Sequence, residues 1–253
     1  AFTPSSTSAP FDGRATIQGK DRLLGYKVGF TLRPVDPLIL GVAYHGATKP
    51  ELTGTVTYHY PNLTPPLASA LQAVVDGAHL VPGPARANVE LPDTLSVGLA
   101  WEANPNLTLA LEAARTGWHT FRQLRVTFGS GQADSITEEH WRDTWYVSLG
   151  ATWRLSNRLQ FRAGLASDQG AVPDAYRTPR IPDQNRTWFS AGLGYRLSDR
   201  STFDLGLTHI RVQDGRLELR AGAPGNPDFF RGNLSGTYAS AIDILAASWS
   251  LRF

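Results

Sequence analysis

The side chains best suited to catalysis or metal binding are scattered along this 253-residue sequence. Cysteine is absent, which removes thiolate nucleophiles, disulfides and Cys-based metal sites. A serine hydrolase needs a serine beside a histidine that acts as its general base, and no recognisable serine motif surrounds any histidine. No two of the six histidines have the spacing of a metal-ligand pair; they are His45, His59, His79, His119, His140 and His209. We therefore predict no enzyme activity, no metal and no cofactor.

The charged residues exclude a second class of function. The net charge is +2, and the arginines are spread along the chain rather than gathered in runs. Neutralising a phosphate backbone requires clustered basic side chains. We expect no nucleic acid partner.

The elements that position these residues are predicted by strict alternation of apolar and small or polar side chains. Between Arg186 and Leu197, the apolar positions are Phe189, Ala191, Leu193, Tyr195 and Leu197. The alternate positions are Trp188, Ser190, Gly192, Gly194 and Arg196. The same pattern covers 95–102, 145–155, 159–168 and 202–208 in segments of about ten residues. No stretch approaches the roughly 20 apolar residues of a spanning helix, so a chain of this kind crosses a bilayer only as a barrel.

Two interpretations of the alternation compete, a soluble β-sandwich or lipocalin-like barrel and an outer-membrane barrel. The polar positions are rich in Gly, Ser and Thr rather than Lys and Glu, which suits a crowded or water-filled lumen. Aromatic residues stand at strand ends on the apolar positions, as in a membrane-interface girdle: Trp101, Trp153, Tyr195, Trp249 and Phe253. The alternating C-terminus ending at Phe253 resembles the signal read by the barrel assembly machinery. The fold class we predict is all-β, a transmembrane antiparallel up-and-down barrel.

Connections alternate between short and long, as in barrels with short periplasmic turns and long extracellular loops. The short turns fall at 33–37, 104–106, 156–158 and 198–201, and the long loops at 61–92, 130–139, 169–184 and 213–237. To keep this order, Leu38–Tyr60 and Leu107–Phe128 must each be one long strand, the former kinked near Pro50. About nine spanning strands result, the first descending from Leu24 to Leu32. Because single-chain barrels have an even number, we expect one domain over 1–253 that is truncated at its N-terminus, with 1–20 as an extracellular hairpin tip.

One helical pattern interrupts the strands, in the long loop 61–92. Its apolar positions follow Pro65-Pro66 with helical spacing: Leu67, Leu71, Val74 and Val75. Such a stripe suits a helix packed over the barrel mouth or a groove that collects a hydrophobic ligand. Both interpretations stay open.

Several runs of residues resemble one family. The run DQGAVPD at 168–174, RTPRIPD at 177–183 and RTWFSAG at 186–192 are the most specific. WRDTW at 141–145, TGW at 116–118 and LPDTL at 91–95 support them. Together they resemble the FadL family of outer-membrane long-chain fatty acid transporters, over roughly Gly19 to Phe253. The resemblance implies a monomeric barrel of about 14 strands with an N-terminal hatch, which is ligand-gated and releases hydrophobic substrates sideways through its wall. On this resemblance, we expect the counterparts of the hatch and of the first strands to be missing from this sequence.

The resemblance also implies site residues. Arg142 lies where the family is expected to place a basic residue facing the ligand, so it is assigned to the carboxylate of a fatty acid. Arg177, Arg180 and Arg186 are weaker candidates, and the alternative for them is a loop network with Asp174 and Asp183 that holds the extracellular lid. Trp118 and Phe121 either line the route of the ligand above the membrane or have a structural role, in the aromatic girdle or in side-chain packing. Leu67, Leu71, Val74 and Val75 form the outer capture surface.

The implied partners are a long-chain fatty acid or another hydrophobic ligand, outer-membrane lipid with lipopolysaccharide, and the assembly machinery through Phe253. Uptake of aromatic or alkane hydrocarbons is an alternative that the sequence does not separate from fatty acid uptake. A structural or general-diffusion porin is the alternative from another class.

Overall fold

The computed structural model describes residues 13–222 and 232–252, which fall into two compact units. The first unit contains the described parts of Ala1–Leu24, Thr48–Leu91 and Gln123–Glu138. The second contains those of Gly25–Ala47, Pro92–Arg122 and Glu139–Phe253. The single domain over 1–253 stays a prediction.

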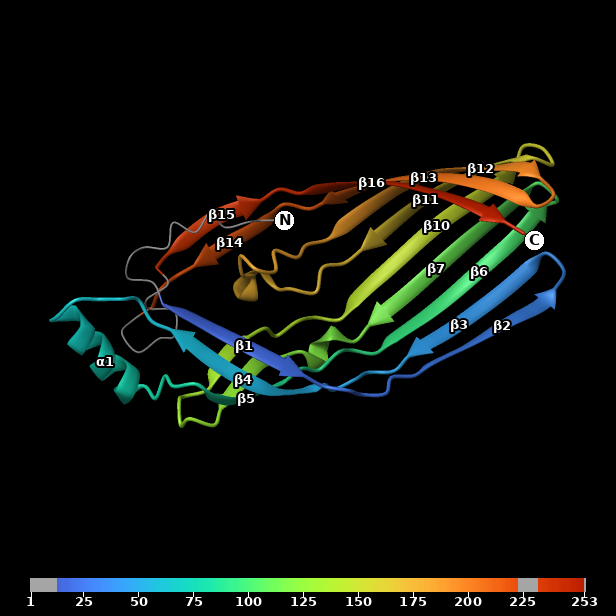
Figure 1. Ribbon diagram of the computed structural model, residues 1–253. Coiled ribbons are helices and arrows are strands. Elements are labelled where there is room, and N and C mark those ends of the chain that lie inside the picture. The colour runs from blue at the N-terminus through green and yellow to red at the C-terminus, as the bar shows by residue number, and fades with distance from the viewer. Residues whose placement is uncertain (1–12, 223–231, 253) are drawn as a thin grey trace. The chain divides into compact units, whose positions relative to one another are not determined.

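The second unit is built on a nine-stranded antiparallel sheet (Figure 1). Its strands are β2 (Lys27–Val35), β3 (Leu38–His45), β6 (Thr94–Asn104), β7 (Leu107–Thr116), β10 (Thr144–Arg154), β11 (Leu159–Asp168), β12 (Arg186–Ser198), β13 (Ser201–Val212) and β16 (Ala241–Leu251). The order across the sheet is β16-β13-β12-β11-β10-β7-β6-β3-β2. The predicted up-and-down strands are confirmed, and the first begins at Lys27 rather than Leu24.

All short turns of this sheet lie at one end. They join β2 to β3, β6 to β7, β10 to β11 and β12 to β13, as the sequence predicted. Figure 1 shows them together at the end where β16 also finishes. The long connections therefore leave from the opposite end of the sheet.

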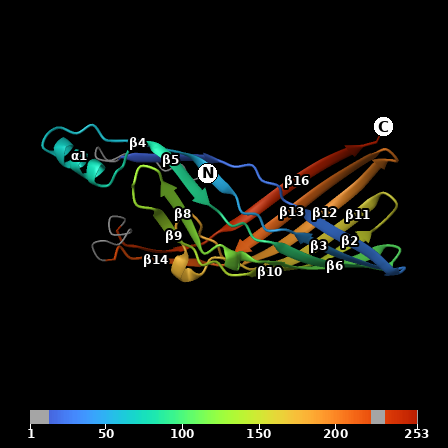
Figure 2. The same ribbon diagram turned by 90° about the horizontal axis from the view of Figure 1, so that it is seen from below.

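The burial of the nine-stranded sheet is inverted with respect to a soluble protein. On β10, Leu149 and Trp153 are 55% and 53% exposed, whereas Ser148 and Gly150, which flank Leu149 on the alternate parity, are half-buried. On β12, Phe189 and Leu193 are likewise exposed and Gly194 is buried. Figure 2 shows that the sheet curls like part of a cylinder wall. A wall with a bare apolar face and a covered face of small residues is stable against lipid tails rather than water.

The connections at the long-loop end of the second unit contain short elements. Residues Trp118–Thr120 form the 3-10 helix η1 after β7, and Asp174–Tyr176 form η2 between β11 and β12. The predicted loop 213–237 contains the hairpin of β14 (Gly215–Leu219) and β15 (Leu234–Tyr238), which the sequence interpretation missed.

The first unit is a five-stranded sheet with one helix. The sheet has the order β1-β4-β5-β8-β9, with β1 (Arg14–Lys20), β4 (Glu51–His59), β5 (Gly83–Asn88), β8 (Gln123–Phe128) and β9 (Ser135–Glu138). The predicted helix is confirmed as α1 (Leu67–Gly77). In the described residues, no helix combines the length and the apolar character needed to cross a membrane.

The two long strands predicted from the sequence were wrong. Leu38–Tyr60 is divided into β3 and β4, and Leu107–Phe128 into β7 and β8, with the members of each pair in different sheets. The first break precedes Pro50, which has no N–H to donate to a ladder. The second break is η1, where the backbone turns and the N–H of Gly117 bonds to the carbonyl of Asp93.

Two further segments of the predicted loops are strands instead. Residues 83–88 and 135–138, within the expected loops, form β5 and β9. β5 begins with Gly83-Pro84, which is typical of a turn, and β9 is too short to display alternation. Of the expected hairpin tip 1–20, Arg14–Lys20 is a strand paired with β4, and 1–12 lie outside the described residues.

Candidate functional site

An aromatic cluster lies at the long-loop end of the second unit. Trp118 of η1 and Phe121 after it both contact Trp141, which precedes β10. The ring centroids of Trp118 and Trp141 are 4.8 Å apart, and those of Phe121 and Trp141 are 4.9 Å apart with the planes at 78°. Such tilted and edge-to-face pairs are favourable arrangements of aromatic rings. Two of the predicted residues are therefore brought together by Trp141, which the sequence interpretation left out.

Arg142 follows this cluster directly in the chain. Its backbone N–H donates to the carbonyl of Ala171 at 2.9 Å, which ties the start of β10 to the connection after β11. Its side chain is exposed. Within the described part of the chain, the Arg142 guanidinium has no ion pair, so its charge is free to meet an anion.

The neighbouring carboxylate is engaged elsewhere. Asp143 accepts the backbone N–H of His119 at 3.0 Å, contacts its ring Nδ1 at 2.6 Å and pairs with Arg115 at 2.5 Å. Burial raises the pKa of Asp143, but these His119 contacts and the Arg115 charge together hold that pKa below its usual value. Asp143 is thus ionised, holds η1 against the start of β10 and leaves Arg142 unneutralised.

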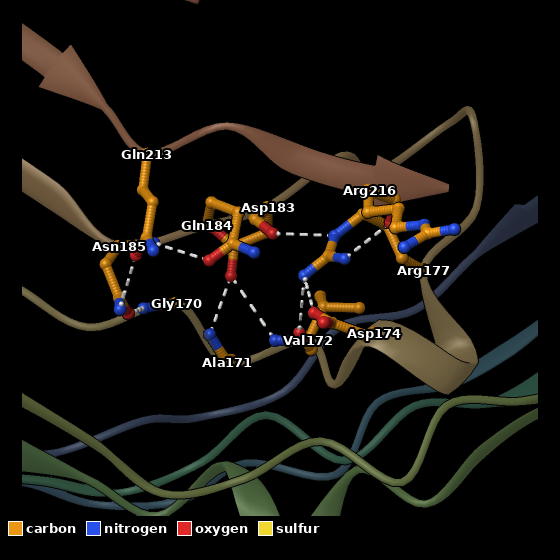
Figure 3. A network of polar contacts seen from close by, with 10 residues as sticks. All are labelled: Gly170, Ala171, Val172, Asp174, Arg177, Asp183, Gln184, Asn185, Gln213 and Arg216. Atoms are coloured by element: carbon orange, nitrogen blue, oxygen red, sulfur yellow. Dashed lines mark hydrogen bonds and ion pairs between the residues drawn. The ribbon is translucent and has the colours of Figure 1, made fainter. Parts of the chain in front are cut away.

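Arg177 is at the centre of a network that holds the connection between β11 and β12 (Figure 3). Its side chain is 1% exposed. Nε donates to the carbonyl of Asp183 at 3.1 Å, and the terminal nitrogens donate to the carbonyls of Arg216 at 2.8 Å and Val172 at 3.3 Å. An ion pair with Asp174 at 2.7 Å adds to these bonds. A guanidinium with these partners is not available to a ligand, so the geometry favours the network interpretation over the carboxylate role.

Arg186 belongs to the same connection. Its Nε lies 3.0 Å from Asp168 and a terminal nitrogen lies 3.5 Å from Asp183, whose other oxygen accepts the N–H of Ala171 at 2.6 Å. Gly170 is required here, because a Cβ would stand 2.7 Å from the backbone carbonyl carbon of Gln184. Among the described residues, exposed Arg180 forms no ion pair.

A groove of about 690 Å³ runs along the covered face of the nine-stranded sheet. Small residues dominate its lining; they include Gly29, Gly41, Ala43, Ser96, Gly98, Ala100, Ala110, Ser148, Gly150 and Gly164. Glu112 and Trp188 also line it. The size lies within the roughly 300 to 1,000 Å³ of small-molecule sites.

The four apolar residues predicted on the helix of the first unit differ in exposure. Leu67 and Val74 are 52% and 60% exposed, Leu71 is half-buried and Val75 is 5% exposed. The hydroxyl of Tyr60 donates to the carbonyl of Leu80, which joins the segments on both sides of the helix. The helix therefore packs through Val75 and leaves an apolar edge bare.

Comparison with known proteins gives a consistent result. Residues 4–253 match the family described as outer membrane protein transport protein (OMPP1/FadL/TodX). A putative outer membrane protein of Neisseria meningitidis serogroup B is 27% identical over 250 residues, which cover 96% of this chain and 53% of that protein. The long-chain fatty acid transport protein of Escherichia coli K12 is 30% identical over 129 residues, 51% of this chain and 29% of that one.

The same likeness appears in three dimensions. The crystal structure of a Pseudomonas aeruginosa FadL homologue matches with a TM-score of 0.78 at 24% identity, over 90% of this chain and 52% of that one. At this identity the match establishes the fold alone. The chain spans about half the length of the curated relatives that it matches first.

Proposed function

Because the chain belongs to the outer membrane protein transport family (OMPP1/FadL/TodX), we propose that it takes up long-chain fatty acids or similar hydrophobic molecules. It is an outer-membrane protein with a β-barrel fold, and its family consists of transport proteins.

The observation that carries the proposal is the exposed side chain of Arg142, which forms no ion pair within the described residues and directly follows Trp141 of the aromatic cluster in the chain. β10, which starts just after Arg142, continues into the groove through Tyr146 and Ser148. A carboxylate that leaves water needs a cation or hydrogen-bond donors, and the exposed guanidinium supplies both. The alkyl chain gains about 0.8 kcal/mol for each CH₂ that the aromatic rings and the groove cover.

The remaining parts of the proposal come from the family resemblance. The apolar edge of α1, with Leu67 and Val74 exposed, would collect ligand outside the membrane. Release would follow ligand-dependent opening of the wall toward the lipid. The protein would act as a monomer surrounded by lipid and lipopolysaccharide. Recognition by the assembly machinery was assigned to Phe253, which lies outside the described residues.

Aromatic hydrocarbons are the second candidate cargo, and the aromatic cluster favours them. An uncharged ring would pack against Trp118, Phe121 and Trp141 in the same tilted and edge-to-face arrangements that these side chains adopt among themselves. Such a ligand has no carboxylate to pair with the Arg142 charge. The two candidates therefore differ in their dependence on Arg142.

Binding of oleate and of toluene to the reconstituted protein and to Arg142→Ala tests the proposal. For a carboxylate cargo, Arg142→Ala weakens oleate binding by about 1.5 to 3 kcal/mol, the contribution of a hydrogen bond to a charged group, and leaves toluene unchanged. Arg211→Ala is the control, because Arg211 is exposed and lies on the lipid-facing parity of β13, which also carries Phe203 and Leu207. Equal losses for both ligands would remove Arg142 from the carboxylate role.

Planar-bilayer recordings address the porin alternative. A general-diffusion barrel conducts ions steadily, whereas a ligand-gated transporter is closed at rest. Steady conductance without ligand would overturn the proposed uptake mechanism.

A further inference from the structure

A second cluster of arginines lies at the other end of the nine-stranded sheet, next to the short turns. The register places Arg154 opposite Gln160, Gln160 opposite Gly194 and Gly194 opposite Asp204. Directly paired residues point to the same side of a sheet. These side chains therefore form one row across β10 to β13, on the face that carries Ser148, Gly150 and Gly192.

Arg162 lies in the neighbouring row, opposite Thr152 and Gly192, and reaches Asp204 across β12, where Gly192 and Gly194 have no side chain. Their ion pair measures 2.8 Å and joins β11 to β13 across β12. On β12 itself, a Cβ at Gly194 would stand 2.9 Å from the Asp204 carboxylate and 3.5 Å from the Arg162 guanidinium. With its amide oxygen turned toward Arg162, Gln160 accepts from Nε at 2.7 Å. Arg162 is therefore fixed in place and its charge is matched by Asp204.

The charges of the other arginines in this cluster are not neutralised by ion pairs among the described residues. Four arginines and a single acid, Asp204, line a pocket of about 90 Å³; the arginines are Arg154, Arg158, Arg162 and Arg196. Arg154 donates to the carbonyl of Pro105 at 3.3 Å. Within residues 13–222 and 232–252, neither Arg154, Arg158 nor Arg196 forms an ion pair. Like charges gathered at one site repel each other, and a bound anion would offset that repulsion.

Anchoring to lipid headgroups does not account for these side chains. Arg154 follows Thr152 and Gly150 on the covered parity of β10, and Arg196 follows Gly194 and Gly192 on that of β12. The lipid-facing neighbours are Trp153, 53% exposed, and Tyr195, 39% exposed. The lipid-facing girdle at this end is thus made of aromatic residues. Arg154 and Arg196 lie on the opposite parity, which faces the inside of the sheet.

An apolar groove adjoins the arginines. A hollow of about 380 Å³ shares Arg162 and Asp204 with the arginine pocket, and its other lining residues are mostly small. It also shares Gly164 and Ser190 with the larger groove. The inner face therefore offers a short apolar path that ends at a cluster of cations.

We propose that this pocket is a second carboxylate site, at the periplasmic end of the passage, for the head group of a single-chain carboxylate whose tail lies in the adjoining groove. The inference deepens the proposed function and rests on it. Arg154 and Arg196 bind the carboxylate, while Arg162 is held by Asp204 and Gln160. The cargo it selects is anionic, so an uncharged hydrocarbon gains nothing from it.

Calorimetric titration of the reconstituted protein with octanoate and with octanol tests the site, because the two ligands differ only in the charged head. Arg154→Gln/Arg196→Gln is expected to raise the Kd for octanoate at least fivefold and to leave octanol unchanged. Arg154→Lys/Arg196→Lys keeps the charge and is expected to stay within twofold of the parent. Arg211→Gln is the control for loss of an arginine outside the passage.

Each other result contradicts the site. An unchanged octanoate Kd in the glutamine variant, or equal losses for octanol, overturns it even if the proteins are folded by circular dichroism. Binding of octanol but not octanoate to the parent overturns the carboxylate site alone and leaves uptake of uncharged molecules standing. Binding of neither ligand overturns the proposed function together with the site.

Discussion

Strands β4 and β10 carry the same alternation and use it in opposite ways. On β4, Val56 is 1% exposed and the threonines beside it face solvent, as in an ordinary soluble sheet. On β10, Val147 is 43% exposed and Ser148 beside it is half-buried. Alternation thus reports that the two faces of a strand differ, and it does not report which face the protein covers.

The difference has a physical cause in what lies against each face. Val56 belongs to the five-stranded sheet of the first unit, in which Ala85 is also buried. Val147 belongs to the nine-stranded sheet, whose apolar parity is bare and suited to lipid.

The largest effect is expected from a charge on the bare face. Leu149→Arg places a guanidinium near the middle of β10 on the lipid side, which should lower the free energy of unfolding in lipid vesicles by about 2 to 4 kcal/mol. Ser148→Arg, one residue away on the lumen side, should change it by less than about 1 kcal/mol. Urea unfolding followed by tryptophan fluorescence measures both. If Ser148→Arg lowered the free energy of unfolding more than Leu149→Arg, the apolar parity of β10 would be the lipid-shielded one, as it is on β4.

The same truncation in the two sheets should give unequal losses. Val56→Ala removes buried methyl groups and leaves a cavity, so the first unit should lose about 2 kcal/mol. Val147→Ala should cost less than about 1 kcal/mol, because lipid fills the space that the side chain vacates. Amide hydrogen exchange on β4 and on β10 reports each unit separately. Comparable losses at the two positions would remove the contrast between the sheets.

The smallest effect is expected from acid at the long-loop end of β10. The pKa of Asp143 is depressed in the folded state, so its stabilising contribution is full above the unfolded-state value and is lost as pH falls through the folded value. Because Arg115 and His119 are largely exposed, the loss should be less than 1 kcal/mol. Fluorescence of Trp118 and Trp141 should shift below about pH 4, and Asp143→Asn should abolish the shift. A shift that persists in this variant would assign it to another group.

Much of the wall could be predicted from the sequence, and less of the site. The turns after β2, β6, β10 and β12 were predicted because Pro, Asn and Ser mark them between alternating runs. β5 was missed because its first residues resemble a turn, and its partners β4 and β8 are distant in sequence. Arg142 and Arg177 were placed in one candidate set, although one is exposed and free and the other is 1% exposed and bonded to three carbonyls.

The sequence by itself determined the alternating strands of the nine-stranded sheet, their parity and their short turns, because side-chain alternation and turn chemistry act between neighbours in the chain. Only the tertiary structure decided which parity is exposed, where β3 ends and β4 begins, and which arginines have ion-pair or hydrogen-bond partners. Those properties depend on residues brought together from distant segments, as when Asp143 meets Arg115 and His119 and thereby leaves Arg142 unpaired.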